Sequence, residues 1–452
     1  MMDMDRGGPA ALVVGGGIAG IQAALDIADA GFTVYLVERE PSVGGRMAQL
    51  DKTFPTLDCS SCILTPKMVD VGQHPNVELM TYAEVESVER REHGFRARVL
   101  QKPRYVDVEA CRGCGDCAEA CRMKGRILSD FDEGIANRSA IYVPFPQAVP
   151  LKYTIDPDAC LYLTRGVCGR TFLCKDACPS DAIDFEQEEQ FFDLDVSAIV
   201  VATGYDLIDP VTKPEYGYGV YPEVMTGIEF ERLSDASGPT KGQILVNGEA
   251  PKDVVFIKCV GSRDPHTGVP YCSRVCCMYT AKHAHLVRDR IPDANITVFY
   301  MDVRAFGKGY EEFYDRVKQE RVSYRRGEPS EVYRRGDKLV VLAEDTLLGE
   351  PVEVEADLVV LATAVVPRTD AQDVADLLGI DRSPDGFFQE ADANLRPVDT
   401  GVDDVFVAGC CQGPKDIPDT VSQAKAAASS ALRALVRARA DEHHPEAAPA
   451  QG

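Results

Sequence analysis

Eight cysteines between residues 111 and 178 constrain the fold of this chain more than any other feature of its sequence. The first four follow the spacing Cys-x2-Cys-x2-Cys-x3-Cys, which is typical of bacterial ferredoxins with two [4Fe–4S] clusters. Loops this short let three thiolates surround one cube-shaped cluster, which neither a disulfide nor a zinc site requires. The sequence therefore predicts two clusters, with a four-thiolate zinc site as the alternative. The eight cysteines are Cys111, Cys114, Cys117, Cys121, Cys160, Cys168, Cys174 and Cys178.

The division of these cysteines between two clusters follows from the crossover rule of ferredoxins, in which the fourth cysteine of a run binds the other cluster. The second run is stretched, since seven residues precede Cys168 and five precede Cys174. Its ligands are therefore less well defined than those of the first run. The expected sets are Cys111, Cys114, Cys117 and Cys178 for one cluster and Cys121, Cys160, Cys168 and Cys174 for the other.

The composition indicates a large protein of a reducing compartment. Of its 452 residues, 45% are hydrophobic, so the chain can bury an extensive core and divide into several domains. Its 16 cysteines fall in short-spaced groups, which favours metal binding in the cytoplasm over a disulfide scaffold. The net charge of −24 disfavours a nucleic-acid partner. No secretory signal is recognised, and no run of about 18 uncharged apolar residues predicts a membrane span.

Residues 11–38 contain the complete pattern of a dinucleotide-binding unit. An apolar strand is followed by Gly15-x-Gly17-x-x-Gly20, an amphipathic helix and a second apolar strand that ends at Glu38. The first glycine permits a tight turn, the second lets the backbone approach a diphosphate, and the third lets the helix pack on the sheet. The helix N-terminus offers free N–H groups to the diphosphate. The acid 18 residues after the third glycine favours this interpretation over a purely structural turn.

Two later segments indicate that the dinucleotide is FAD. Residues 198–204 (AIVVATG) resemble the return strand of flavin-disulfide-reductase domains, and residues 405–409 (VFVAG) precede a long helix predicted from Ile417 to about Arg437. In that superfamily the start of this helix points at the flavin pyrimidine, where its dipole stabilises negative charge. Many relatives have Gly-Asp after the strand, where this chain has Gly-Cys. The residues expected to bind FAD are Gly15, Gly17, Gly20, Glu38, Gly45, Arg46, Thr203, Gly204, Gly409 and Val421.

A second dinucleotide-type domain is predicted further along the chain, but it lacks the glycine fingerprint. A strand at 253–258 (DVVFIK), a helix near 272–290 and a strand at 296–302 follow in βαβ order. Where Gly-x-Gly-x-x-Gly would begin, the sequence is Cys259-Val-Gly-Ser-Arg. Cys272 and Cys276 are expected four residues apart on one face of the helix start. These cysteines predict a third [4Fe–4S] cluster, with a set of buried core cysteines as the alternative. The expected ligands are Cys259, Cys272, Cys276 and Cys277.

Long and specific motifs carry a resemblance to one family. They include YCSRVCCMYTAKHAHL within residues 259–286, DVRAFGKGYEEFY at 302–314 and GCCQGPKDIPDTVSQAKAAA at 409–428, with further segments at 57–85 and 140–162. Over roughly residues 10–435, the chain resembles the A subunit of heterodisulfide reductase and its bacterial relatives. Long members of this family have an N-terminal cluster domain and two C-terminal clusters without a counterpart in these 452 residues. The resemblance is therefore to a short form.

The resemblance implies an α/β fold of the thioredoxin-reductase type. Two dinucleotide-binding domains with Rossmann-type sheets would be joined by an inserted ferredoxin-like domain with two [4Fe–4S] clusters. FAD and about three clusters are the implied cofactors. The expected divisions are an FAD-binding domain in 1–100, 189–245 and 366–439, the ferredoxin-like insert in 101–188, a second Rossmann-like domain in 246–365 and a disordered tail in 440–452.

The resemblance also implies an oxidoreductase component that passes electrons between a redox donor and a partner subunit that reduces thiols or disulfides. Some family members bifurcate electrons at the flavin. The implied partners are the other subunits of such a complex and a donor protein, which would be a ferredoxin, a hydrogenase or a dehydrogenase subunit. A homodimer within the larger complex is expected. No catalytic side chain is expected, because the flavin carries the chemistry.

Cys59-x2-Cys62 is the pair that admits two interpretations. We favour ligands for a cluster completed by another domain or subunit. The alternative is the redox dithiol of a self-contained NAD(P)H-dependent disulfide reductase, against which the missing second glycine motif argues. Two further rivals are the A subunit of a quinone-interacting oxidoreductase, which is expected to lack the ferredoxin insert, and a redox sensor without catalysis. Cys410 and Cys411 are expected in packing or around the flavin.

Overall fold

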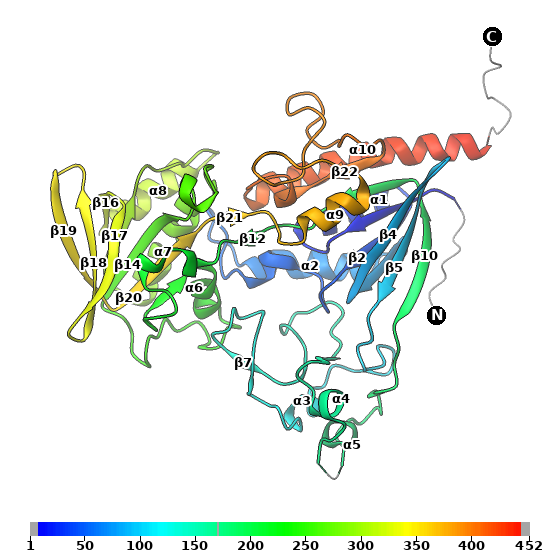
Figure 1. The fold of residues 1–452 in the computed structure, drawn as a ribbon, viewed down its shortest axis with the longest axis horizontal. Helices are drawn as coiled ribbons and strands as arrows, with labels where there is room; N and C mark the ends of the chain where they lie inside the picture. Colours follow the sequence, from blue (N-terminus) through cyan, green and yellow to red (C-terminus); the bar gives the residue numbers. More distant parts are fainter. Residues whose placement is uncertain (1–7, 170, 444–452) are drawn as a thin grey trace.

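The computed structural model describes residues 8–169 and 171–443. Figure 1 shows three bodies: a domain beneath the long red helix, a second domain in green and yellow, and a small insert in cyan and teal below them. Among the described residues, no helix has both the length and the apolar composition needed to cross a membrane. The fold is of the α/β class with parallel sheets.

The first domain is built on a five-stranded parallel sheet. Its central strand, AALVV, is buried on both faces, as is usual where helices or a second sheet cover a parallel sheet. The strand–helix–strand unit of residues 11–38 connects two neighbouring strands of this sheet. In order across the sheet, the strands are β22 (Val405–Val407), β11 (Ala198–Val201), β1 (Ala10–Val14), β2 (Thr33–Glu38) and β3 (Val77–Thr81).

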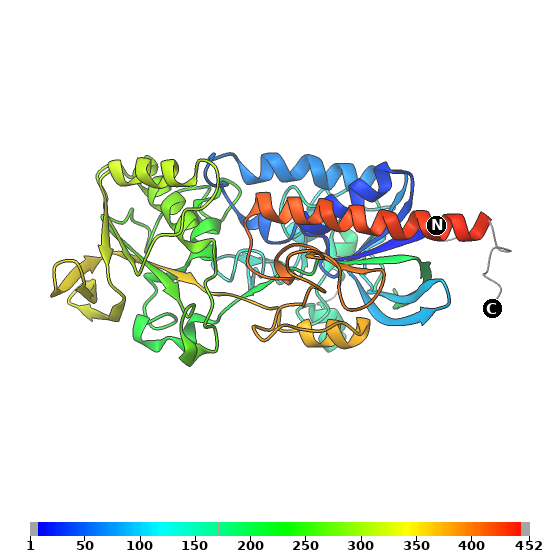
Figure 2. The ribbon, with the colours of Figure 1, turned by 90° about the horizontal axis from the view of Figure 1, so that it is seen from above.

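Two different layers cover the faces of this sheet, and Figure 2 shows them on opposite sides. Because successive strand residues point to opposite faces, Ala11 and Val13 pack toward one layer, and Ala10 and Leu12 toward the other. The helical layer contains α1 (Ile18–Asp29), α2 (Ser60–Gln73) and α10 (Ile417–His443). The opposite layer contains α9 (Ala371–Leu378) and a three-stranded antiparallel sheet of β4 (Ala83–Arg91), β5 (Gly94–Gln101) and β10 (Gln190–Val196).

The second domain repeats this architecture and lies in the sequence between β11 and β22 of the first sheet. Its parallel strands are, in spatial order, β13 (Val224–Thr226), β20 (Leu358–Thr363), β14 (Asp253–Val260), β15 (Asn295–Tyr300) and β16 (Val322–Arg326). One face packs against α6 (Gly227–Ser234), α7 (Cys276–Arg290) and α8 (Tyr310–Gln319). The other packs against β17 (Pro329–Arg335), β18 (Lys338–Asp345) and β19 (Glu350–Ala356). The connecting segments pair as β12 (Asp206–Leu207) and β21 (Val365–Val366).

The insert leaves the first domain after β5 and returns at β10. These two strands pair directly, with Gln101 opposite Gln190, so the insert departs and returns at one point of the antiparallel sheet. Its core consists largely of cysteines and small apolar side chains. The insert contains α3 (Asp116–Glu119), α4 (Leu161–Arg165), α5 (Leu173–Asp176), β6 (Ile127–Leu128), β7 (Asn137–Arg138), β8 (Ile141–Tyr142) and β9 (Thr154–Ile155). Short 3-10 helices elsewhere are η1 (Gly45–Gln49), η2 (Pro210–Thr212), η3 (Pro214–Tyr216), η4 (Pro265–Thr267) and η5 (Gly409–Cys411).

The last helix differs in length from the sequence expectation. It was predicted to end near Arg437, but α10 continues to His443. A buried row of alanines on α10, such as Ala424 and Ala431, packs against α1 and the sheet, which stabilises the helix beyond its intrinsic propensity. Of the predicted disordered tail, residues 444–452 lie outside the described residues.

Candidate flavin and iron–sulfur sites

A cavity of about 1490 Å³ lies at the carboxyl ends of β1, β2 and β11, where dinucleotides bind in open α/β sheets. Seven of the ten predicted FAD residues line it, namely Gly15, Gly17, Glu38, Gly45, Arg46, Thr203 and Gly204. The other three do not line it, but neighbours of two of them do: Ala408 and Cys410 flank Gly409, and Thr420 precedes Val421. The third, Gly20, lies behind the cavity in α1.

Glycine is required at each of the three fingerprint positions for a different geometric reason. Gly15 has a φ of +105°, and a Cβ there would lie 2.5 Å from the carbonyl oxygen of Ala202. A Cβ on Gly20 would lie 1.8 Å from the carbonyl oxygen of Gly15, so this glycine permits α1 to approach β1. A Cβ on Gly17 would meet nothing within 4 Å. Gly17 thus leaves open a cradle at the N-terminus of α1 that a side chain would fill, as diphosphate binding requires.

Glu38 lines the cavity beside this cradle, at the end of β2. Its carboxylate accepts hydrogen bonds from the backbone N–H groups of Gly16, at 2.6 Å, and Glu40, at 2.9 Å. Burial raises the pKa of Glu38 to about 7, although the two N–H donors favour the charged form. An acid fixed in this way at the end of β2 has the position from which the ribose hydroxyls of a dinucleotide are bound.

The beginning of α10 forms another wall of the cavity. Ile417, Pro418 and Thr420 line it, and this first turn carries the positive end of the helix dipole. Asp416 caps the helix, because its side chain accepts from the N–H of Asp419 at 2.9 Å and its carbonyl from the N–H of Thr420 at 2.9 Å. The half-buried Lys415 donates from its Nζ to the carbonyl oxygens of Gly409 and Gly413, at 3.2 and 3.0 Å. An ammonium and a helix N-terminus thus lie at this wall beside the carboxylate of Asp416, and the first two suit the pyrimidine end of a reduced flavin.

The Gly-Cys pair that replaces Gly-Asp has two roles. Cys410 lines the cavity, and its thiol donates to the carbonyl oxygen of Lys415 at 3.4 Å. Cys411 packs in the apolar core, where its thiol donates to the carbonyl of Val201 at 3.3 Å. The thiol of Cys410 is therefore part of the cavity wall, and the thiol of Cys411 packs in the core.

In the insert, one group of thiols forms around Cys117. Burial raises the pKa of the Cys117 thiol to about 12, and three neighbouring thiols raise it further. These neighbours are Cys111, Cys178 and Cys114. Cys178 is more than 50 residues away in the sequence, and the fold brings it to the first run; its Sγ accepts from the backbone N–H of Ala182 at 3.3 Å. The four thiols coincide with the first predicted set.

A second group forms around Cys174. Burial raises the pKa of this thiol to about 11, and the neighbours that raise it further are Cys121, Cys160 and Cys168. The carbonyl oxygen of Cys160 accepts from the N–H of Thr164 at 3.0 Å, at the start of α4. The stretched spacing of the second run is thus accommodated by two short helices, α4 and α5. These four thiols coincide with the second predicted set, and ligation itself stays a prediction.

Within residues 8–169 and 171–443, no three side chains of Cys, His, Asp or Glu are arranged to hold one metal ion. A cubane has a different requirement, because each thiolate binds a different iron at a different corner of the cluster. The four ligands are then separated by the whole cluster, and the choice between cubanes and zinc stays a prediction.

A third group of thiols lies in the second domain, at the junction of β14 and α7. Cys259, Cys276 and Cys277 are all buried and pack together. A hydrogen bond with Cys276 lowers the pKa of Cys277 to about 5, and the nearby ammonium of Lys258, 3.3 Å from Cys277 Sγ, also favours the thiolate. This junction is where a nicotinamide coenzyme places its diphosphate in two-nucleotide reductases.

The fourth expected member of this group, Cys272, is not on the helix. The prediction that Cys272 and Cys276 share one helical face is wrong, because α7 begins at Cys276. Arg274 has a φ of +67°, and the hydroxyl of Ser273 accepts a hydrogen bond from the N–H of Val365. These two features hold residues 272–275 as a turn. Cys272 lies in this turn, where its Sγ accepts from the N–H of Arg274 at 3.3 Å, and its place in the group stays a prediction.

Cys59 and Cys62 are joined by a disulfide at the start of α2. Cys62 is exposed, and its backbone N–H donates to the Sγ of Cys59 at 3.1 Å. The adjacent residues Asp58 and Ile63 line the cavity. A disulfide here agrees with the interpretation of the pair as a redox dithiol. The favoured interpretation, in which both sulfurs are thiolate ligands of a cluster, stays a prediction.

Sequence reasoning missed a set of buried charges beside the cavity. Glu231 of α6 pairs with Lys282 and His283 of α7, and all three side chains are at most 3% exposed. Burial alone would raise the pKa of Glu231, but the ammonium and the imidazole hold it at about 2. Its carboxylate also accepts from the N–H of Asp51 at 3.0 Å. Lys282 and His283 lie within the motif AKHAHL, but no spacing rule indicates that they meet a glutamate of another helix.

Comparison with known proteins shows which proteins this chain is similar to. Residues 11–56 match the family of FAD-dependent oxidoreductases. The second iron–sulfur A subunit of the CoB–CoM heterodisulfide reductase of Methanopyrus kandleri is 56% identical over 94% of this chain and 64% of its own length. By sequence the chain is similar to the A subunits of heterodisulfide reductases over 94% of its length. The A subunit of the H2:CoB–CoM heterodisulfide,ferredoxin reductase of Methanothermobacter marburgensis is 52% identical over 94% of this chain and 64% of its own length.

Solved structures show the fold of this chain. Thioredoxin reductase of T. acidophilum superimposes with a TM-score of 0.52 over 94% of this chain and 98% of its own, at 16% identity. The fold is therefore of the thioredoxin-reductase type, as the sequence predicted. The chain spans 64% of the length of the two heterodisulfide reductase relatives described above.

Proposed function

We propose that this chain is the FAD- and iron–sulfur-containing electron-transfer subunit of a heterodisulfide reductase-like complex. The observation that carries the proposal is that the same chain has three groups of thiols, two in the insert and one in the second domain, together with a dinucleotide cavity. An enzyme that needed only a nicotinamide coenzyme and a dithiol would require none of these groups. The high identity to heterodisulfide reductase A subunits supports the same assignment.

The residues of the cavity fit FAD. Gly17 and the N-terminus of α1 would bind the diphosphate, Glu38 the ribose, and the first turn of α10 the pyrimidine end of the flavin. Bound FAD supplies the exchange between electron pairs and single electrons. The chain contributes orientation, exclusion of water and positive charge from Lys415 and the α10 dipole, which stabilise a negatively charged ring. No side chain is assigned as an acid, base or nucleophile.

The thiol groups fit three [4Fe–4S] clusters, held by the two sets of the insert and by Cys259, Cys272, Cys276 and Cys277. Electrons would pass between a redox donor and a partner subunit that reduces thiols or disulfides. The names of related reductases mention hydrogen, formate and ferredoxin, so a ferredoxin, hydrogenase or dehydrogenase subunit is the proposed donor. We further propose a homodimer within the larger complex and a cytoplasmic location.

The Cys59–Cys62 disulfide favours a second candidate, a self-contained NAD(P)H-dependent disulfide reductase. Such an enzyme needs a coenzyme site in the second domain. At the end of β14 that domain has Cys259, followed by a loop up to Cys276, where a nicotinamide fingerprint would supply glycines. The two candidates therefore predict opposite responses to NADH.

Anaerobic mixing with NADH or NADPH is expected to leave the flavin of the isolated chain oxidised on the time scale of turnover. Thiols take the place where the coenzyme diphosphate would bind, so reduction should be slower than about 1 per second, the low end of ordinary enzyme turnover. Stopped-flow absorbance near the flavin maximum measures this. Dithionite serves as the positive control, because it should bleach both the flavin and the clusters.

Flavin bleaching by NADH at a catalytic rate, without any partner protein, would favour the disulfide reductase. Clusters that dithionite cannot reduce would count against the electron-transfer proposal itself. Reduced ferredoxin added in place of NADH is the third arm, and it should bleach the flavin through the clusters.

A further inference from the structure

Two segments of the insert line the cavity, residues 142–145 and a hairpin formed by β6, β7 and the loop between them. Its loop, residues 129–134, lines the cavity together with η1 and α6. Its base belongs to the cysteine core: Ile127 packs there, and the hydroxyl of Ser139 donates to the carbonyl of Ala118 at 3.2 Å, within the turn between Cys117 and Cys121. The hairpin thus joins the thiol groups to the cavity.

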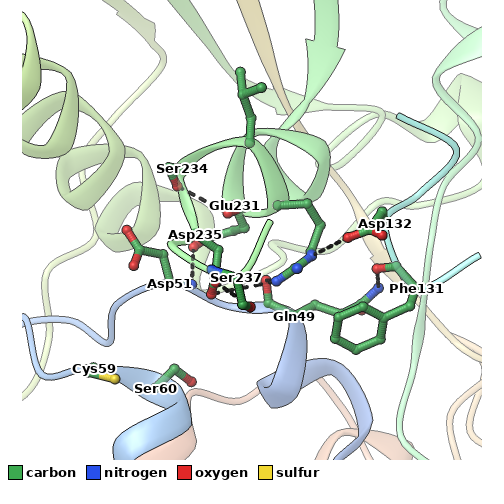
Figure 3. Close-up of polar contacts among 12 residues, drawn as sticks. Gln49, Asp51, Cys59, Ser60, Phe131, Asp132, Glu231, Ser234, Asp235 and Ser237 are labelled. Carbon is green, nitrogen blue, oxygen red and sulfur yellow. Dashed lines mark hydrogen bonds and ion pairs between the residues drawn. The ribbon is translucent and has the colours of Figure 1, made fainter. Parts of the chain in front are cut away.

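Arg232 of α6 holds the loop of this hairpin from the second domain. Its side chain is 1% exposed, and its Nε donates to Asp132 Oδ1 at 3.0 Å. The other carboxylate oxygen of Asp132 accepts from the hydroxyl of Ser129 at 2.9 Å, which fixes the acid within the loop. Figure 3 shows Asp132, Phe131 and Gln49 gathered beside α6. A buried arginine is stable only when its charge is paired, so its position depends on this loop.

The same guanidinium makes contacts with all three bodies of the fold. It lies over the ring of Phe131, 4.7 Å from the centroid, and Phe131 stacks on Phe145, which packs in the core of the first domain. It also donates to the backbone carbonyl of Gln49 in η1 at 3.4 Å and pairs with Asp235 of its own domain. Arginine suits this place because its planar group stacks and donates in several directions at once.

The flavin domain grips the loop from the opposite side. Arg46 pairs with Glu133 at 2.5 Å, and the side-chain amide of Gln49 donates to Glu133 at 2.7 Å and to the carbonyl of Phe131 at 2.9 Å. Arg46 is one of the residues predicted to contact FAD. The loop is therefore clamped between the flavin site and α6.

We propose that Arg232 is a positioning residue that clamps the hairpin at residues 127–138 and thereby sets the distance from the thiol groups of the insert to the flavin. This inference rests on the proposed function, in which single electrons leave a reduced cluster of the insert and enter the flavin, two of them with one proton completing its reduction to the anionic hydroquinone. Arg232 itself exchanges neither electron nor proton.

The test compares the loaded wild-type chain with Arg232→Met, Asp132→Asn and a matched control, Arg96→Met. Arg96 forms an exposed two-point pair with Asp195 on the first domain, away from the hairpin. In Arg232→Met and Asp132→Asn, we expect the amides of residues 127–138 to exchange hydrogen at least about tenfold faster. Removing one partner of a buried ion pair destabilises the segment that the pair holds, and this loss of stability exceeds the free energy that corresponds to a tenfold change in exchange rate. The control should leave this segment unchanged.

Electron transfer within the chain is the second readout. Laser-flash photoreduction with deazariboflavin gives a phase whose rate does not depend on protein concentration. We expect this phase to slow at least about tenfold in both hairpin variants, since a misplacement of about 1 Å can cost on the order of 100-fold where geometry limits a rate. Cluster potentials and flavin content should match the wild type.

Two results would overturn the proposal: unchanged exchange of the hairpin, or a loosened hairpin with an unchanged transfer rate, which is what a merely stabilising arginine predicts. If Arg232→Met does not fold, Asp132→Asn carries the test, because it leaves α6 intact. If the wild type itself passes no electrons from insert to flavin, the proposed function fails, and the exchange data alone then decide whether Arg232 holds the hairpin.

Discussion

A chain with Gly17→Val is expected to purify folded and free of flavin. The new Cβ would meet nothing within 4 Å in the protein, so the substitution costs little in packing, but it fills the cradle at the start of α1. We expect flavin affinity to fall by about 100-fold or more, which corresponds to roughly 2.8 kcal/mol. Flavin released by heat and measured by fluorescence against protein concentration checks this.

Gly401→Val provides the matched control for this variant. Gly401 lies in an exposed turn, and its added Cβ would come no closer than 3.6 Å to another residue, at Asp381. It should retain full flavin. A Gly17→Val chain that still purifies yellow at full occupancy would refute the assignment of this site.

Loss of one thiol in the second domain is expected to remove one whole cluster. With three cubanes, the loaded chain should contain about 12 irons, and Cys276→Ser should lower this to about 8 while FAD stays bound. The flavin should remain because the cavity glycines belong to the other domain. Anaerobic iron and sulfide analysis, together with flavin content, measures both quantities.

Cys411→Ser is the matched control, because Cys411 is equally buried but donates to backbone carbonyls in the apolar core. Its iron content should stay at the wild-type value. Stoichiometric zinc, or a wild-type content near four irons per chain, would contradict the three-cluster count. If Cys276→Ser unfolds the second domain, the cluster has a structural role there in addition to electron transfer.

The parts of this protein that could be predicted from the sequence are those governed by short-range rules. The strand, the three glycines, the helix and Glu38 lie within 28 residues, and steric and dipolar requirements fix each of them locally. The spacing of Cys111, Cys114 and Cys117 is likewise a local property. The approach of Cys178 to this first run joins distant residues, but it follows from the crossover rule that two-cluster ferredoxins share.

The turn before α7 shows where local reasoning fails. A four-residue spacing predicts one helical face for Cys272 and Cys276, and nothing in the sequence between them forbids a helix. The tertiary contact of Ser273 with Val365, a residue of a different strand, holds the turn instead. The energy of one long-range hydrogen bond and of the packing around it exceeds the small difference in local propensity.

The sequence by itself therefore determined the fold class and most of the residues that line the cavity, and it predicted the cofactor classes. Only the tertiary structure decided which charges are buried. Arg232 and Asp132 are 100 residues apart, and Glu231 and Lys282 are 51 apart, and each is an ordinary charged residue of a helix or loop when read locally. Burial makes the pairing of such groups obligatory, because an unpaired charge in the interior is far more costly than one in water. Burial is a property of the assembled domains, so no local pattern of residues reveals it.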